Sequence, residues 1–345
     1  MSETAFLLST ENLEKWFPVR GGFFGRSTSH VKAVDGVSMD IRRGETFGLV
    51  GESGCGKTTL GRTLMRLTDA TGGRIYFDGN DVTNLRGRRL KPLRRKMQMV
   101  FQDPYASLDP RQSIRSALTE PMMLHHVVPS RSEANGFAAE LVEKVGLNPD
   151  HLSRFPHEFS GGQRQRVAIA AALAVKPTFV VLDEPTSSLD VSVQSQILRL
   201  LKSLQKELGL TYILISHNLA VIRQMCDRTA VMYLGRIVEL ADTGEIFANP
   251  KHPYTRALLS AVPIPDPSKR KALQVLEGDV PRPVEIPTGC RFRNRCRFAT
   301  DKCEAQFPPL AEVEANHWIE CHYDIDFYSN SRRDFSPAQT PKARP

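Results

Sequence analysis

The sequence has no apolar run long enough to cross a lipid bilayer. A membrane-spanning helix needs about 18 or more consecutive apolar residues, whereas the longest candidate, Val167–Val175, has nine. The N-terminus also lacks a basic stretch ahead of an apolar core and carries the acidic Glu3, which argues against a secretory signal. No internal repeat is visible, so a tandem array is excluded. We therefore expect a globular chain that neither spans a membrane nor is secreted.

Cysteine is scarce outside one short window. Cys55 and Cys226 stand alone, and the other four fall within 32 residues: Cys290, Cys296, Cys303 and Cys321. In a cytosolic chain such a cluster indicates a metal site before it indicates disulfides. The gaps are wider than those of common zinc sites, where about two to four residues separate the first pair. Four thiolates suit a [4Fe–4S] cluster, with zinc as the runner-up and four reduced thiols as the third interpretation.

Positive charge exceeds negative charge only modestly in this sequence. Lys and Arg number 46 against 38 Asp and Glu, giving a net charge of +8. This balance is compatible with nucleic acid, an anionic membrane surface or phosphate ligands, and it selects none of them. The segment Arg86–Lys96 holds seven basic residues in eleven and could contact nucleic acid. We favour a solvated connection, because runs of charge are usually exposed faces.

Short β-rich apolar runs alternate with helical patterns between residues 46 and 240. This alternation is typical of a parallel sheet wrapped by helices. Ligands in such sheets bind outside the carboxyl ends of the strands, so the residues that follow each strand matter most. Four such runs are followed directly by glycine or a polar residue: Thr46–Val50 by Gly51, Met97–Phe101 by Gln102, Phe179–Leu182 by Asp183, and Tyr212–Ile215 by Ser216-His217. The sequence therefore predicts a nucleotide site at this edge.

A phosphate-binding loop follows the first of these runs. Gly51–Thr58 fits G-x-x-x-x-G-K-[ST] between a predicted strand and a predicted helix. Glycines let the backbone curl so that its N–H groups point at phosphate oxygens, and the helix adds its N-terminal dipole. Lys57 should reach the β- and γ-phosphates, and Thr58 should ligate Mg²⁺. The predicted nucleotide-binding residues here are Gly51, Glu52, Ser53, Gly54, Cys55, Gly56, Lys57, Thr58 and Thr59.

An acidic pair follows the buried strand Phe179–Leu182. Asp183, directly after the strand, is positioned to hold Mg²⁺. Glu184, the next residue, is positioned to polarise the attacking water. A lone acidic pair would more often cap a helix, but the phosphate loop upstream favours the catalytic interpretation. Residues Ser160–Gln163 precede a helical run and would by themselves indicate a helix N-cap.

Taken in order along the chain, these elements resemble the nucleotide-binding subunit of an ATP-binding cassette (ABC) transporter. Phe159–Gln163 is similar to the signature of that family, with Phe in place of the more usual Leu. Gln102 matches its Q-loop, Ser187–Asp190 its D-loop and His217 its switch histidine. The resemblance implies an α/β fold: a P-loop NTPase core of the ABC ATPase type, with an antiparallel β lobe and an inserted helical lobe.

The C-terminal part narrows the resemblance. Asn249–Leu259 and Gly289–His322 resemble the extension of the dipeptide/oligopeptide importer ATPases, a subfamily shared with opine, nickel and glutathione importers. Those ATPases carry a [4Fe–4S] cluster at the corresponding cysteines. We expect an ABC nucleotide-binding domain over residues 1–250, with its helical lobe at about 103–175 and a β-hairpin at 72–82. The C-terminal expectations are a Pro-rich linker at 251–287, a small four-cysteine module at 288–325 and a disordered tail at 326–345.

The resemblance also implies how the site works. Two ATP molecules would lie between two head-to-tail subunits, so that Ser160, Gly161, Gly162 and Gln163 contact the ATP of the partner and Asp190 links the two sites. Glu184 is the expected general base, with Lys57 stabilising charge and His217 bonding the γ-phosphate and orienting Glu184. Gln102 would sense Mg²⁺ and the water, joining Thr58 and Asp183 at the metal. Adenine is expected to stack on Phe17, with Trp16 as runner-up.

The implied partners are a second ABC ATPase subunit, favoured as a diverged sibling, two membrane permease subunits and, indirectly, an extracytoplasmic substrate-binding protein. The chain would then sit peripherally on the cytoplasmic face of the inner membrane. Two rivals are weighed against this: a nucleic-acid- or ribosome-associated ABC ATPase with a metal cluster, and a signalling ATPase with a metal sensor. We expect no nucleic acid, because the chain carries one cassette rather than a fused pair.

Overall fold

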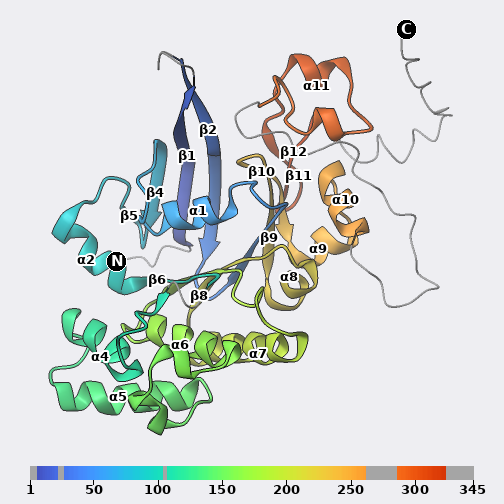
Figure 1. Cartoon of the computed structure of the whole chain (residues 1–345). Helices are drawn as coiled ribbons and strands as arrows, with labels where there is room; N and C mark the ends of the chain where they lie inside the picture. The colour runs from blue at the N-terminus through green and yellow to red at the C-terminus, as the bar shows by residue number, and fades with distance from the viewer. Residues whose placement is uncertain (1–5, 22–26, 104–106, 262–285, 324–345) are drawn as a thin grey trace.

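The computed structural model describes residues 6–21, 27–103, 107–261 and 286–323, and within these ranges the strands form two sheets (Figure 1). One sheet is four-stranded, with the order β2-β1-β4-β5, and its neighbouring strands are antiparallel. Its strands are β1 (Phe6–Gly21), β2 (Ser27–Arg42), β4 (Gly72–Phe77) and β5 (Asn80–Asp81). This sheet is the antiparallel β lobe that the sequence predicts.

The second sheet is eight-stranded, with the order β11-β12-β10-β9-β3-β8-β7-β6. Neighbouring strands from β9 to β6 run parallel. Every residue of β3, β7 and β8 is buried, which explains their near-continuous apolar sequences. The four predicted strand ends therefore meet at one edge, as expected. The strands of this parallel part are β3 (Thr46–Val50), β6 (Met97–Val100), β7 (Phe179–Asp183), β8 (Thr211–Ile215) and β9 (Arg228–Tyr233).

The predicted hairpin at residues 72–82 is confirmed. Strands β4 and β5 pair with Phe77 opposite Asn80. The turn residues Asp78 and Gly79 have φ values of 54° and 73°, and two consecutive positive φ values are what a two-residue hairpin turn of type I′ requires.

The helices lie on both sides of the second sheet. Helix α1 (Lys57–Leu64) lies beside the β lobe, and α4, α5, α6 and α7 gather at the opposite end of the molecule (Figure 1). Ser113, Ser130 and Ser160 cap α4, α5 and α6 by accepting a hydrogen bond from a first-turn amide. The α-helices up to α8 are α1, α2 (Leu90–Lys96), α4 (Ile114–Leu124), α5 (Arg131–Lys144), α6 (Gly161–Leu173), α7 (Val191–Leu208) and α8 (Leu219–Met225).

The C-terminal region extends the second sheet. Strand β12 (His317–Glu320) pairs antiparallel with β10 (Arg236–Asp242), and β11 (Leu310–Glu314) lies at the edge. Within the expected linker, Pro253–Ser260 form helix α10. The remaining elements are α9 (Thr243–Ala248), α11 (Asp301–Ala305) and the 3₁₀ turns η1 (Gly87–Arg89), η2 (Pro149–Ser153), η3 (Pro156–Glu158) and η5 (Arg293–Arg295).

The predictions for residues 262–285 and for the tail at 326–345 fall outside the described residues. Among the helices that the structure describes, none combines the length and apolar character needed to span a membrane.

Candidate functional site

A cavity of about 670 Å³ opens at the carboxyl edge of the second sheet. Its floor is the phosphate loop, residues 53–59, and its walls include Phe17, Gln102, Glu184 and His217. The volume lies within the range of about 300–1,000 Å³ that is typical of small-molecule sites. The cavity thus brings together residues from five separate parts of the sequence that were predicted to share a site.

Two glycines fix the shape of the phosphate loop. Gly51 has φ 153° and Gly56 has φ 111°, values that a residue with a Cβ adopts only under strain. A Cβ on Gly51 would lie 2.2 Å from the Met232 carbonyl oxygen, and one on Gly56 would lie 2.0 Å from the Ala33 carbonyl oxygen. Both positions therefore require glycine, for conformation and for space.

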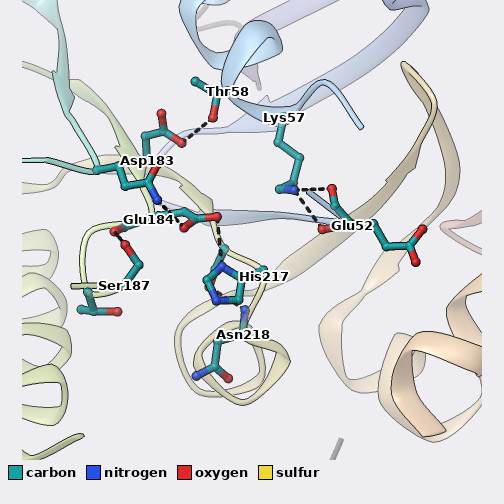
Figure 2. Close-up of polar contacts among 12 residues, drawn as sticks. Glu52, Lys57, Thr58, Asp183, Glu184, Ser187, His217 and Asn218 are labelled. Carbon is teal, nitrogen blue, oxygen red and sulfur yellow. Dashed lines mark hydrogen bonds and ion pairs between the residues drawn. The ribbon is translucent and has the colours of Figure 1, made fainter. Parts of the chain in front are cut away.

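Lys57 lies buried within the loop that it serves. Its Nζ donates hydrogen bonds to the carbonyl oxygens of Gly51, at 2.9 Å, and of Glu52, at 2.8 Å, as Figure 2 shows. Phosphate oxygens can replace these neutral acceptors with stronger, charge-assisted hydrogen bonds. The neighbouring Cys55 is buried, and burial raises the pKa of its thiol, so this cysteine is a neutral spacer at pH 7.

Thr58 and Asp183 place two oxygen ligands side by side. The Thr58 hydroxyl donates to Asp183 Oδ1 at 2.9 Å (Figure 2). Burial raises the pKa of Asp183, and the hydrogen bond from Thr58 lowers it in part. Mg²⁺ prefers such oxygen ligands and is usually held by one or two carboxylates together with substrate phosphates. A hydroxyl next to one buried carboxylate at a helix N-terminus fits this ion.

Glu184 stands at the centre of the site. Gln102 Nε2 donates to Glu184 Oε2 at 3.0 Å, and His217 Nδ1 lies 3.0 Å from Glu184 Oε1 (Figure 2 shows the histidine contact). The backbone of Glu184 has φ 48°, and its N–H donates to the Ile215 carbonyl at 2.9 Å. A left-handed conformation is uncommon for a non-glycine residue, and here it turns the side chain off the end of β7.

The two aromatic candidates point to different places. Phe17 lines the cavity and is 39% exposed, whereas Trp16 donates through Nε1 to Asp35 at 3.1 Å. Leu234 and Gly235 also line the cavity, although no sequence motif indicated them. Gly235 N–H donates to the Cys55 carbonyl at 2.8 Å, and the Leu-Gly pair, which forms the turn between β9 and β10, is the signal that could have found them.

The predicted signature residues lie outside the cavity lining that the described residues form. Ser160 caps α6, and its backbone N–H donates to Gln163 Oε1 at 3.1 Å. A Cβ on Gly162 would lie 2.5 Å from Val193 Cγ1, so α6 packs closely on α7. Asp190 caps α7 and accepts from Val193 N at 3.0 Å, which lowers the pKa of its carboxyl. Ser160 and Asp190 are both exposed.

The four clustered cysteines do come near one another. Burial raises the pKa of Cys290 to about 12 and that of Cys296 to about 11, and the thiols of Cys303 and Cys321 add to both shifts. Across the described ranges, however, no three or more His, Cys, Asp or Glu side chains are arranged to hold a metal ion. The predicted [4Fe–4S] cluster at Cys290, Cys296, Cys303 and Cys321, and the zinc alternative, are therefore not supported. Spacing along the chain predicts proximity but not the direction of each thiol.

Comparison with known proteins agrees with this geometry. The ABC transporter family matches residues 34–187, and the oligopeptide/dipeptide transporter C-terminal region matches residues 238–303. The oligopeptide transport ATP-binding protein AppF of Bacillus subtilis is 48% identical over 92% of this chain and 97% of its own length. The probable peptide ABC transporter ATP-binding protein y4tS of Sinorhizobium fredii is 50% identical over 92% of this chain and 89% of its own.

Solved structures extend the likeness to the fold. The ATP-binding cassette MJ0796, in a dimeric post-hydrolysis state bound to ADP and Pi, is 28% identical with a TM-score of 0.61. The match covers 68% of this chain and 98% of that one. CbiO1 from Clostridium perfringens, part of the ABC transporter complex cbiONQ, is 30% identical with a TM-score of 0.61 over 71% of this chain and 92% of its own.

Proposed function

The chain belongs to the ABC transporter family, and from this premise we propose that it is the ATPase subunit of a peptide importer. It binds and hydrolyses ATP at an interface with a second cassette and so drives uptake of di- or oligopeptides, or of a related small solute, through partner membrane subunits. The observation that carries the proposal is Glu184, held between Gln102 and His217 on the wall of a nucleotide-sized cavity above the phosphate loop.

ATP binding rests on the loop and on Phe17. The loop amides and the first turn of α1 receive the phosphates, and Lys57 exchanges two backbone carbonyls for β- and γ-phosphate oxygens. Phe17 offers its exposed ring to the adenine. Thr58, Asp183 and Gln102 are the residues that would hold Mg²⁺, which supplies charge neutralisation on the phosphate oxygens when bound.

Hydrolysis is an in-line transfer of the terminal phosphoryl group to water. Glu184 accepts the proton of the attacking water, and Gln102 and His217 fix the orientation of its two carboxylate oxygens. Since a carboxylate only accepts hydrogen bonds, the proton of the contact with His217 lies on Nδ1. Lys57 stabilises the charge on the transferring group, and such positioning and electrostatic stabilisation dominate this type of reaction.

A second cassette completes the site. Ser160, Gly161, Gly162 and Gln163 would contact an ATP bound by the partner, and Asp190 would link the two sites. Two observations support this: these residues lie apart from the cavity lining of their own chain, and one structural relative is a dimer with ADP and Pi. We propose a diverged sibling as the partner, two permease subunits that contact the helical lobe, and an extracytoplasmic substrate-binding protein.

The proposed location is the cytoplasmic face of the inner membrane, held there by the permease subunits. The rival functions rest on weaker grounds. The basic segment 86–96 forms η1 and α2 at the surface, and its Lys96 pairs with Asp78 at 3.0 Å, as expected of a solvated face. The matched C-terminal region is that of peptide transporters.

Co-expression with the neighbouring permease and cassette genes tests the proposal. We expect the four-subunit complex to co-purify and, in proteoliposomes, to take up labelled peptide only with ATP on the cassette side. A Lys57→Ala complex is the matched control, since it keeps the assembly and removes phosphate binding. Association with RNA and no recovery of membrane subunits would contradict the proposal.

A further inference from the structure

Glu52, the second residue of the phosphate loop, is held from three directions. Its backbone N–H donates to the Tyr254 hydroxyl at 2.9 Å, and its carbonyl accepts from Lys57 Nζ at 2.8 Å. Its carboxylate accepts from Arg295 Nη1 at 2.6 Å and from Arg295 Nη2 at 2.9 Å. Two of the three partners come from beyond residue 250, although the residue they hold belongs to the loop that cradles phosphate.

The Arg295–Glu52 pair is bidentate and sheltered. Two parallel hydrogen bonds between a guanidinium and a carboxylate fix orientation as well as distance. The side chain of Arg295 is 5% exposed and that of Glu52 is 23% exposed, so salt screens the pair less than it would a surface pair. The hydrogen bonds to Glu52 raise the pKa of Arg295 above its ordinary value.

Tyr254 is fixed by a cluster of aromatic rings behind the loop. Its ring is fully buried, with centroids 4.7 Å from Tyr233 and 5.4 Å from Phe292. Phe292 also lies edge-on to Tyr233 at 5.3 Å. Next to Phe292, the buried Arg291 donates to the Leu234 carbonyl and to Asp35. The C-terminal region therefore packs against Leu234, which lines the cavity, as well as against the phosphate loop.

The loop geometry makes this contact consequential. Lys57 uses the Glu52 carbonyl as an acceptor, and the loop N–H groups that point at phosphate follow directly in sequence. A loop of positive-φ glycines has many alternative conformations, and ordering them on binding would cost free energy. Groups that hold the loop in one conformation beforehand reduce that cost and so strengthen binding.

We propose that the C-terminal region beyond residue 250 is a positioning element of the ATP site, in which Tyr254 of α10 and Arg295 of the four-cysteine segment hold Glu52 and thereby the loop in its phosphate-binding conformation. The inference rests on the proposed ATP binding and adds a role for a region outside the ATPase core. Arg295 is a positioning residue, since its own contacts are the Glu52 carboxylate and the Tyr233 ring.

The test uses four variants of the full-length chain: Arg295→Met, Arg295→Lys, Glu52→Gln and the double variant R295M/E52Q. The matched control is Arg293→Met. Arg293 lies in the same 3₁₀ turn, but it donates to Thr288 and pairs with Glu304 within the C-terminal region itself. For each variant, the Kd for Mg-ATP, and the kcat and KM of hydrolysis, are measured.

We expect Arg295→Met to raise the Kd and the KM for ATP by about fivefold or more, the lower end of typical coupling between sites, with kcat near that of the unmodified chain. Arg295→Lys keeps the charge but loses the bidentate geometry, and it should recover part of the affinity. The double variant should bind ATP no more weakly than Arg295→Met, because both changes break one interaction. Arg293→Met should match the unmodified chain.

Several results would overturn the inference. These are an unchanged Kd in Arg295→Met, an equal rise in Arg293→Met, or additive effects in the double variant. If Arg295→Met does not fold, Glu52→Gln tests the same contact from the loop side, and an unchanged Kd there is equally contradictory. Failure of the unmodified chain to bind Mg-ATP would instead refute the proposed function, so the two failures are distinguishable.

Discussion

His217 Nδ1 lies 3.0 Å from Glu184 Oε1. This contact links the ends of two neighbouring parallel strands, β8 and β7. Glu184 leaves its strand through a left-handed backbone turn, and His217 follows its strand one residue before Asn218 caps α8. Their side chains meet because both strands end at the same edge. The contact gives the proposed base a fixed orientation, which is what general-base catalysis requires.

Replacing His217 with Ala should separate binding from chemistry. We expect kcat to fall by about 10²-fold or more, the contribution typical of a group that aligns proton transfer, while the Kd for Mg-ATP changes little. Single-turnover hydrolysis measures the chemical step directly. The control is His157→Ala, since His157 is exposed in η3 and stacks on Phe155. Equal losses in both variants would show that the Glu184 contact has no special role.

Replacing Gly56 with Ala should disrupt the loop more than backbone strain alone can explain. At Gly56 a Cβ would lie 2.0 Å from the Ala33 carbonyl oxygen, whereas at Gly44, with φ 75°, nothing lies within 4 Å. Gly44→Ala should therefore lower the free energy of unfolding by about 1–2 kcal/mol through strain alone and leave ATP binding intact. Gly56→Ala should abolish binding. Urea unfolding and ATP titration compare the two, and normal binding by Gly56→Ala would contradict the assigned loop geometry.

Removing magnesium should stop hydrolysis and expose the role of Asp183. With excess chelator, we expect ATP to bind more weakly and no phosphate to be released, because the phosphate charges lose their neutralising ion. Asp183→Asn removes the one buried carboxylate next to Thr58, so the Mg²⁺ concentration for half-maximal hydrolysis should rise by about tenfold or more. An unchanged magnesium dependence would place the ion elsewhere.

Glu320 should make stability depend on pH. Burial raises its pKa from the ordinary 4.5 to about 7, while Arg236 and Arg291 oppose the shift and Asp35 adds to it. The folded chain thus holds this proton more tightly than the unfolded chain does, and the free energy of unfolding should fall as pH rises from about 4.5 to about 7. The expected loss is about 1–3 kcal/mol.

Glu320→Gln should remove that pH dependence, as measured by urea unfolding at pH 4.5 and pH 7.5. Glu312→Gln is the control, because Glu312 is exposed on the neighbouring β11. A stability profile that is unchanged in Glu320→Gln would show that Glu320 titrates alike in both states.

Much of the site could be predicted from local sequence. The phosphate loop, the acidic pair and His217 each follow a short buried strand, and the parallel pairing of those strands brings them together. These elements can be recognised in the sequence for two physical reasons. Strands that are buried on both faces have nearly continuous apolar sequences, and a loop that binds phosphate needs glycine at fixed positions.

The contacts of the C-terminal region could not be predicted. Glu52 and Arg295 are 243 positions apart, and the periodicity of apolar residues predicts no contact between residues so far apart in the sequence. Strand β12 joins the core sheet beside β10, so residues expected in a separate module lie on the sheet that carries the site. The cysteine spacing indicated proximity correctly, but a metal site also needs converging side chains, and the described structure does not show them.

We propose that ATP holds this chain to a second cassette and that hydrolysis at Glu184 releases the pair. Light scattering on Glu184→Gln with its partner cassette, with and without Mg-ATP, tests it most directly. We expect a stable nucleotide-dependent pair, with turnover reduced by about 10²–10⁴-fold. A pair that fails to form with Mg-ATP, or a Glu184→Gln variant that hydrolyses ATP at the rate of the unmodified chain, would contradict it.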